Sequence, residues 1–252
     1  MHAPKPTDAA AARTPGVGSG SEHPFGCEGD AAMTTLYLAR HGETVWHGEH
    51  RYAGSSDVEL TAHGLAQADE LAEWASRARL SAVVSSTLSR ARLTAEPAAD
   101  AAELELRTDP RLVEIDFGAG EGLGPGELAE RMPAEWAAFE RHPARQPLPG
   151  GEAGVEGIAR AQPALRELVD EFGIGPGTVG GSAASRQGDR VLVVMHGTLM
   201  RLLLCDWLGI DPDRYRDLFP EVENCGLTPV RFELLEGRMQ PRLIGFNLPT
   251  AR

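Results

Sequence analysis

The stretch Thr34-Thr-Leu-Tyr-Leu-Ala-Arg-His-Gly-Glu-Thr44 decides the fold prediction. Its first six residues are apolar or β-branched for the most part, and they predict a β-strand over 34–39. Arg40 and His41 follow at the carboxyl end of that strand, which is where α/β proteins place reactive groups. Gly42 then allows the backbone to turn sharply. The sequence thus delivers an arginine and a histidine to one edge of a predicted sheet.

Polar residues also follow two other predicted strands. This repetition supports a functional role for His41, because a single histidine after a strand is more often structural. The run Val191–Met195 is the clearest buried strand, and His196 comes directly after it. A shorter strand over 82–84 leads toward Arg90. The carboxyl ends of parallel strands meet at one edge of a sheet. Two histidines and two arginines should therefore converge on one pocket.

Helical patterns alternate with these strands as they do in βαβ units. Helices are predicted at 63–78, from Ser86 onward, near 127–140 and at 198–208, and further strands at 104–107, 230–235 and 238–244, the last two forming a hairpin at a sheet edge. The predicted fold class is α/β, a three-layer sandwich with a mostly parallel central sheet and helices on both faces.

The remaining segments define the expected domain organisation. Residues 1–32 are poor in large apolar side chains and predict a disordered N-terminal tail, followed by a single domain over 33–252. Residues 118–150 are expected to be an insertion that caps the active edge. The Gly-rich stretch 173–189 predicts a flexible loop. The tail does not have the pattern of a signal peptide, and Met33 is a candidate start of translation.

Charge and composition exclude several classes of partner. The 24 basic and 37 acidic residues give a net charge of −13, which repels nucleic acid and anionic membranes. No apolar run approaches the roughly 20 residues that span a bilayer. The three cysteines, Cys27, Cys205 and Cys225, form no C-x-x-C pair, so we expect no disulfide framework and a cytoplasmic location.

Other hydrolytic and covalent chemistries find little support. The eight histidines include no H-E-x-x-H or similar spacing, which disfavours a zinc hydrolase, and no G-x-S-x-G motif indicates a serine hydrolase. The only lysine, Lys5, lies in the predicted tail, so a Schiff-base enzyme is excluded in practice. Two histidines with two arginines instead suit phosphoryl transfer, because a neutral imidazole can attack phosphorus while guanidinium groups bind the phosphoryl oxygens. We expect no metal and no cofactor.

The motifs around these residues give a family resemblance. They form five spaced segments, Arg40–Thr44, Gly54–Ala68, Ser85–Ala95, Leu112–Gly118 and His196-Gly197. In these segments and their order the chain resembles the histidine phosphatase superfamily, which is phosphoglycerate-mutase-like, over residues 34 to 246. The resemblance implies a metal-independent hydrolase acting on a small-molecule phosphomonoester through a phosphohistidine. Dimers are common in that family, so a homodimer is compatible with it.

The resemblance also implies a role for each matching residue. His41 is the nucleophile, and Glu114 donates a proton to the leaving oxygen. Three residues hold the phosphoryl group: Arg40, Arg90 and His196. The residue after Trp46 is commonly an Asn that assists phosphate binding, and His47, which replaces it here, is counted with the phosphate-binding residues. The Gly-x-Trp-Glu-Gly that often follows the acid residue is Gly118-Ala-Gly-Glu-Gly122, without the Trp.

Two alternatives remain. Bisphosphoglycerate-dependent mutases typically follow the acid residue with Arg and then Tyr, whereas Ile115 and Asp116 follow Glu114 here, which disfavours a doubly anionic ligand and favours a phosphatase. A catalytically silent domain that binds a phospho-ligand is the alternative from another class, and the full set of chemical residues argues against it. Five side chains are candidate substrate contacts: Trp46, Tyr52, Trp136, Phe139 and Arg141.

Overall fold

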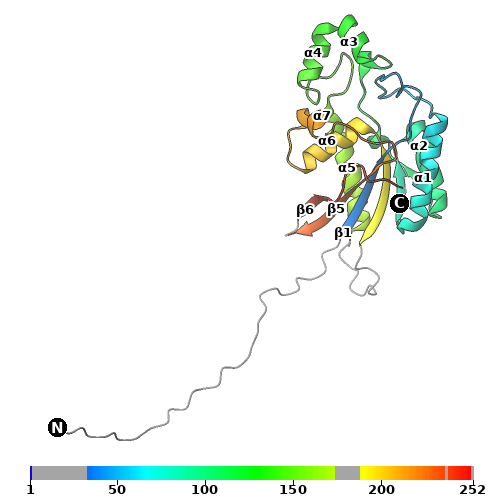
Figure 1. Ribbon diagram of the computed structural model, residues 1–252, viewed down its shortest axis with the longest axis vertical. Coiled ribbons are helices and arrows are strands. Elements are labelled where there is room, and N and C mark those ends of the chain that lie inside the picture. Colours follow the sequence, from blue (N-terminus) through cyan, green and yellow to red (C-terminus); the bar gives the residue numbers. More distant parts are fainter. Residues whose placement is uncertain (2–32, 174–187, 236–237, 251–252) are drawn as a thin grey trace. The chain divides into compact units, whose positions relative to one another are not determined.

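The computed structural model describes Met1 and residues 33–173, 188–235 and 238–250 (Figure 1). The tail expected up to residue 32, apart from Met1, and most of the loop expected over 173–189 lie outside the described residues.

Six strands form one sheet in the order β3-β2-β4-β1-β5-β6. They are β1 (Met33–Arg40), β2 (Ala82–Ser85), β3 (Leu106–Thr108), β4 (Asp189–Met195), β5 (Leu227–Leu235) and β6 (Arg238–Leu243). The first four strands in the spatial order are parallel, and β5 and β6 run antiparallel as a hairpin at the sheet edge. The predicted mostly parallel sheet and its edge hairpin are confirmed.

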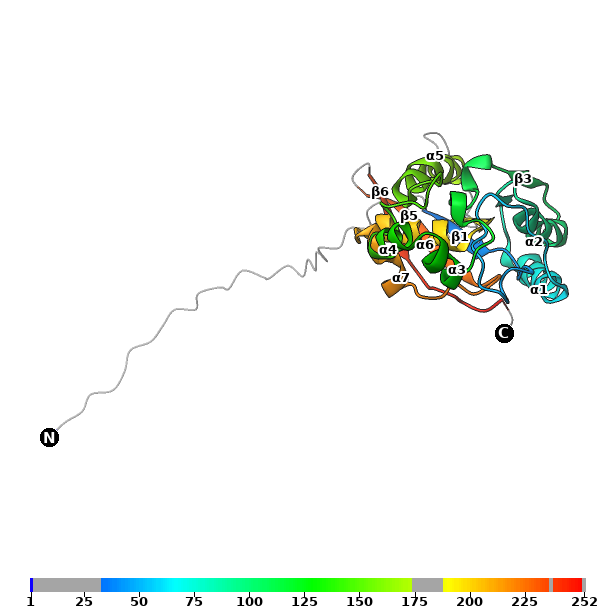
Figure 2. The ribbon, with the colours of Figure 1, turned by 90° about the horizontal axis from the view of Figure 1, so that it is seen from above.

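Helices cover both faces of this sheet. The seven described α-helices are α1 (Ala62–Ala78), α2 (Ser89–Ala101), α3 (Pro125–Arg131), α4 (Pro133–Arg141), α5 (Gly154–Phe172), α6 (Gly197–Trp207) and α7 (Tyr215–Leu218). Figures 1 and 2 show α1 and α2 on one face and α5 and α6 on the other. The predicted three-layer α/β architecture is confirmed. Within the described residues, no helix combines the length and apolarity needed to cross a membrane.

The alternation of side chains along β1 explains the two layers. Leu36 and Leu38 are fully buried among residues of α5 and α6, whereas Ala39 packs with α1 and α2. The run Val191–Met195 in β4 is fully buried on both faces, as expected for a central strand of a parallel sheet. An alternating strand and a continuously apolar strand thus lie side by side at the centre of the domain.

Several boundaries differ from the prediction. The helix expected from Ser86 begins at Ser89. The helix expected over 127–140 is two helices, because Pro133 disfavours helical geometry at Met132, whose φ of −143° ends α3 before α4 begins. Helix α5, which the sequence analysis did not delimit, runs for 19 residues despite an internal proline.

The strand register brings the predicted reactive residues together. Arg40 on β1 pairs with Met195 on β4, so His41 and His196 follow at neighbouring strand ends. Ser85 on β2 pairs with Val194 on the other side of β4. Figure 1 shows α3 and α4 beyond the edge toward which these strands point.

Candidate active site

His41 is held by its backbone and by one ring nitrogen. Its N–H donates to the Met195 carbonyl at 3.0 Å, and its own carbonyl accepts from the Asn224 amide at 2.7 Å. The ring Nδ1 lies 2.8 Å from the Gly42 carbonyl oxygen. A carbonyl oxygen can only accept, so Nδ1 carries the hydrogen and Nε2 carries the lone pair. The ring therefore presents the lone pair of Nε2 on the side of Arg90, the tautomer that a histidine nucleophile requires.

The turn after β1 requires glycine. A Cβ on Gly42 would lie 2.4 Å from the carbonyl oxygen of Gly64, so no side chain fits between the turn and the start of α1. The Gly42 N–H donates to Thr94 Oγ1 at 2.9 Å, and that hydroxyl in turn donates to the carbonyl of Arg90 at 2.7 Å. The turn that presents His41 is thereby tied to the helix that presents Arg90.

Burial keeps His41 neutral. The residue is 5% exposed. Burial, followed by the nearby His196 and the positive charges of Arg90 and Arg40, holds the pKa of His41 well below its usual range. An imidazole without a proton on Nε2 is the form that can attack an electrophile.

Arg90, in the first turn of α2, is fully buried beside that nitrogen. Its Nε lies 3.3 Å from His41 Nε2. Its terminal nitrogens donate to backbone carbonyls of one loop, to Ser56 at 2.7 Å and to Gly54 at 2.8 Å. The guanidinium is thus fixed by the 53–56 loop with its Nε directed at His41 Nε2.

Glu121 fixes that loop from behind. Its carboxylate accepts from the backbone N–H groups of Gly54, Ser55 and Ser56 at distances between 2.9 and 3.2 Å. A Cβ on Gly54 would lie 2.3 Å from the Glu121 carboxylate and 2.2 Å from the carbonyl of Ile115, so this close approach requires glycine. The Glu of the 118–122 segment thus has a structural role that does not need the missing Trp.

Arg40 reaches the pocket from the end of β1. Its Nη1 donates to the Val222 carbonyl at 2.9 Å, and its Nη2 contacts His47 Nε2. Burial, and next the positive charge of Arg201, lowers the pKa of Arg40 to about 10, so the group stays protonated at neutral pH. Its Nε has no hydrogen-bond partner among the described residues.

His47 is oriented by the hydrogen bonds on both ring nitrogens. Arg40 Nη2 contacts Nε2, while the Thr44 backbone N–H donates to Nδ1 at 2.9 Å and Thr44 Oγ1 lies 2.8 Å from the same atom. Burial, followed by the Arg40 charge, lowers the pKa of His47 to about 4. A neutral His47 therefore lines the pocket and holds Arg40, while direct binding of phosphate by His47 stays a prediction.

His196 follows β4 and lies next to His41. It is fully buried, and its ring centroid is 5.2 Å from that of His41. Ser86 Oγ lies 2.6 Å from His196 Nε2, and with that hydroxyl donating, Nδ1 bears a hydrogen. Among the described residues, this Nδ1 and Arg40 Nε are the two buried side-chain atoms without a partner. Unpaired buried donors are costly, and oxygens of an anion beside His41 would satisfy both.

Glu114 lies at the N-terminus of α6. Its Oε2 accepts from the N–H of Thr198 at 2.9 Å, and its Oε1 accepts from Leu199 at 2.8 Å and from Ile115 at 2.9 Å. The residue is 7% exposed. The structure therefore brings Glu114 to the same pocket as His41, with Oε2 as the oxygen that has the fewer partners.

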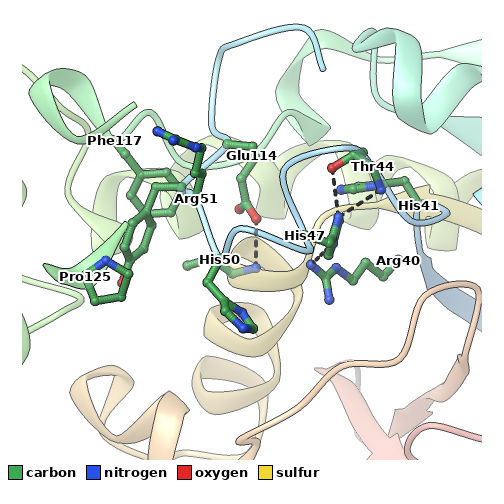
Figure 3. A pocket seen from close by; sticks show the side chains of 12 residues that line it. Arg40, His41, Thr44, His47, His50, Arg51, Glu114, Phe117 and Pro125 are labelled. Carbon is green, nitrogen blue, oxygen red and sulfur yellow. Dashed lines mark hydrogen bonds between the residues drawn. The ribbon is translucent and has the colours of Figure 1, made fainter. Parts of the chain in front are cut away.

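These residues surround a cavity of about 310 Å³. Figure 3 shows Arg40 and His41 on one side of it, Phe117 and Pro125 on the other, and Glu114 between them. The cavity brings together an imidazole, a guanidinium and a carboxylate beneath the segment that begins α3.

The candidate substrate contacts are only partly found in the cavity. Tyr52 lines it. Trp136 and Phe139 are buried in the hydrophobic core, and Trp46 lies against Gly122. The expectation that these three aromatic residues face the substrate is not supported by their positions.

Several residues of the site were not assigned by sequence reasoning. Ser86 and Thr94 stood in a recognised motif without a role, whereas Asn224 and the Val222 carbonyl come from a loop with no recognisable pattern. Arg201 on α6 contributes to the charge around Arg40 and was also missed. No sequence pattern identifies Asn224, Val222 or Arg201 as residues of the site, and only their positions in the folded chain do so.

Comparisons with known proteins show which family the chain resembles. The family model of the histidine phosphatase superfamily (branch 1) matches residues 36–242. A probable phosphoglycerate mutase of Proteus mirabilis is 33% identical over 201 residues, which are 80% of this chain and 86% of that protein. Phosphoserine phosphatase 1 of Hydrogenobacter thermophilus is 31% identical over 183 residues, 73% of this chain and 80% of that protein.

A solved structure gives the same comparison in three dimensions. The mycobacterial glucosyl-3-phosphoglycerate phosphatase in its VO3 complex superimposes with a TM-score of 0.73 at 28% sequence identity. The match covers 85% of this chain and 99% of that one.

Proposed function

The chain belongs to the histidine phosphatase superfamily, and we propose that it is a phosphomonoesterase that hydrolyses a small phosphorylated metabolite through a phosphohistidine on His41. The observation that carries this proposal is the neutral imidazole of His41 in the same site as two buried, unpartnered nitrogens, Arg40 Nε and His196 Nδ1. Phosphatases among the relatives support the same class of reaction. A cytoplasmic location, and a homodimer, remain part of the expectation from sequence.

The proposed reaction has two balanced steps. In the first, the lone pair of His41 Nε2 forms a P–N bond, the ester P–O bond breaks, and Glu114 gives its proton to the departing oxygen. In the second, water attacks phosphorus, its proton returns to the Glu114 carboxylate, and the P–N bond breaks to release inorganic phosphate. Arg40, Arg90 and His196 are assigned to the phosphoryl oxygens, where positive charge and hydrogen bonds stabilise the transition state.

A mutase is the second candidate, because relatives named as probable phosphoglycerate mutases match 80% of the chain. The residues after Glu114 do not supply the cation typical of mutases: the Ile115 side chain is buried, and the Asp116 carboxylate accepts from the Gly118 N–H at 2.7 Å. We therefore favour hydrolysis over transfer to a second hydroxyl.

Phosphate release is the direct test of this assignment. The protein should liberate inorganic phosphate from p-nitrophenyl phosphate and from members of a panel of phosphorylated metabolites, since the leaving group departs and water accepts the phosphoryl group. A coupled assay for interconversion of 2- and 3-phosphoglycerate, primed with 2,3-bisphosphoglycerate, should show little turnover by comparison. Efficient interconversion with negligible phosphate release would assign the chain to the mutases, and neither activity would favour the silent binding domain.

Chelation should leave the rate of hydrolysis within about twofold, because guanidinium groups supply the positive charge that a metal would otherwise bring to the phosphoryl oxygens. The measurement compares hydrolysis of p-nitrophenyl phosphate before and after dialysis against EDTA, with a known zinc-dependent phosphatase as the control for effective chelation. Loss of turnover that Zn²⁺ or Mg²⁺ restores would contradict the metal-independent mechanism.

A further inference from the structure

A second cavity adjoins the pocket around His41. It also has a volume of about 310 Å³, and it shares Arg40, Glu114 and Thr198 with the first cavity. Arg201 lines the second cavity but not the first. A substrate whose ester oxygen lies beside Glu114 can therefore extend toward Arg201 from the same position.

Arg201 has no acidic partner at ion-pair distance among the described residues, although it is largely withdrawn from water. Its Nε donates to the Gly197 carbonyl at 3.0 Å, one turn earlier in α6. Its Nη1 has only long contacts, at 3.4 and 3.5 Å, with the carbonyls of Phe219 and Pro220. Burial, without a carboxylate at contact distance, lowers the pKa of Arg201. A cation in this state is poised to bind an anion.

Arg216 adds positive charge behind Arg201. Both guanidinium groups lie over the ring of Tyr215, at 4.7 and 5.4 Å from its centroid. Arg216 also donates to the Tyr215 hydroxyl at 2.9 Å and approaches the hydroxyl of Tyr52 at 3.4 Å. Tyr52 lines the first cavity, so Arg216 contacts one residue of its wall.

Two arginines line the second cavity. Arg40 and Arg201 are these residues, and in the part of the chain that the structure describes neither has a carboxylate at ion-pair distance. Arg40 is assigned to the phosphoryl group. Arg201 is therefore the cation left to bind a second anionic group of the substrate.

We propose that Arg201 binds a carboxylate carried by the substrate, so that the enzyme prefers phosphomonoesters of hydroxy acids over phosphomonoesters of simple alcohols. This inference rests on the proposed function and names its substrate class. The planar fork of a guanidinium matches a carboxylate, and Arg216 is already committed to two tyrosine hydroxyls.

A second phosphate fits this place less well. It would bring two negative charges, against one for a carboxylate, next to the exposed side chains of Glu221 and Glu223 at the margin of the second cavity. The residues after Glu114 disfavour a second anionic group only at their own wall of the site. Arg201 supplies a cation at another wall, from α6.

A purely structural role for Arg201 makes a different prediction. Its contacts with the carbonyls of Phe219 and Pro220 hold the loop whose Val222 carbonyl accepts from Arg40. If Arg201 acted only through that loop, its loss would weaken the binding of every phosphomonoester to the same degree. Two ligands that differ in a single carboxylate separate the two roles.

The matched ligands are 3-phosphoglycerate and glycerol 3-phosphate, in which a carboxylate is replaced by a hydroxymethyl group. Dissociation constants are measured by calorimetry on full-length His41→Ala protein, so that no turnover is needed. We expect 3-phosphoglycerate to bind ~10-fold or more tightly than glycerol 3-phosphate, because one charge-assisted hydrogen-bonded pair contributes affinity on that scale. Adding Arg201→Met should reduce the preference to within about twofold and leave the affinity for glycerol 3-phosphate nearly unchanged.

Two further variants complete the experiment. Arg201→Lys retains the charge and should keep part of the preference, and Arg92→Met, which removes an exposed arginine paired with Glu96 on α2, should keep all of it. No preference in the His41→Ala protein, or an equal loss for both ligands on Arg201→Met, would overturn the proposal. A preference that holds in binding while the wild-type protein releases no phosphate would instead reject the proposed hydrolysis and keep the carboxylate site.

Discussion

Replacing His41 with alanine should lower phosphate release by about 10⁴-fold or more, the scale of loss seen when a covalent nucleophile is removed. Among the described residues at the pocket, His41 alone combines a neutral imidazole, an Nδ1 that donates to a backbone carbonyl and a position directly after β1. His196 is the weaker candidate, because Ser86 Oγ lies 2.6 Å from its Nε2, whereas Arg90 Nε is 3.3 Å from Nε2 of His41. The variant should fold, since the two hydrogen bonds that anchor residue 41 use its backbone.

Rapid quenching with radiolabelled substrate gives the decisive measurement. Wild-type protein should carry an acid-labile label, as phosphohistidine does, and the His41→Ala protein should carry none. His63→Ala is the matched control, because His63 is an exposed histidine on α1 and should leave the rate unchanged. Full activity in the His41 variant, or an acid-stable label on the wild-type protein, would show that another residue is the nucleophile.

The sheet could be predicted because its signals are local. Apolar runs such as Val191–Met195 identify buried strands by composition, and a parallel arrangement then places their carboxyl ends together. This reasoning is enough to bring His41 next to His196 and to place Arg90 nearby. The proline at position 133 also indicates the break between α3 and α4, although the sequence analysis predicts a single helix near 127–140.

The partners of these residues could not be predicted, because they depend on contacts between distant segments. Asn224 donates to the carbonyl of His41 across 183 residues of chain, and the Thr198 N–H donates to Glu114 across 84. Arg201 is one of 24 basic residues, nearly all arginine, so its type carried no information before its position beside Arg40 was known. Sequence patterns thus identify residues for phosphoryl chemistry, whereas specificity arises from loops and helix faces that only the folded chain brings together.

Changing Glu114 to glutamine should slow formation of the phosphoenzyme by about 10²–10⁴-fold for an alkyl or sugar phosphate and by little for p-nitrophenyl phosphate. An alkoxide is a poor leaving group that needs a proton as the P–O bond breaks, whereas p-nitrophenolate departs without one. Oε2 accepts one backbone N–H and Oε1 accepts two, so Oε2 is the oxygen that has room to carry the proton.

Glutamine tests this role because it preserves most of the surrounding hydrogen bonds. Its carbonyl oxygen can keep the position of Oε1 at the amides of Leu199 and Ile115, while its NH₂ group takes the place of Oε2 and cannot donate a proton to the leaving oxygen. Steady-state turnover would mix two effects, since the same carboxylate is assigned to activate the water that hydrolyses the phosphohistidine. Rapid-quench measurement of the first step separates them. An equal loss of the first-step rate for both substrates would mean that Glu114 organises the N-terminus of α6 and is not the acid.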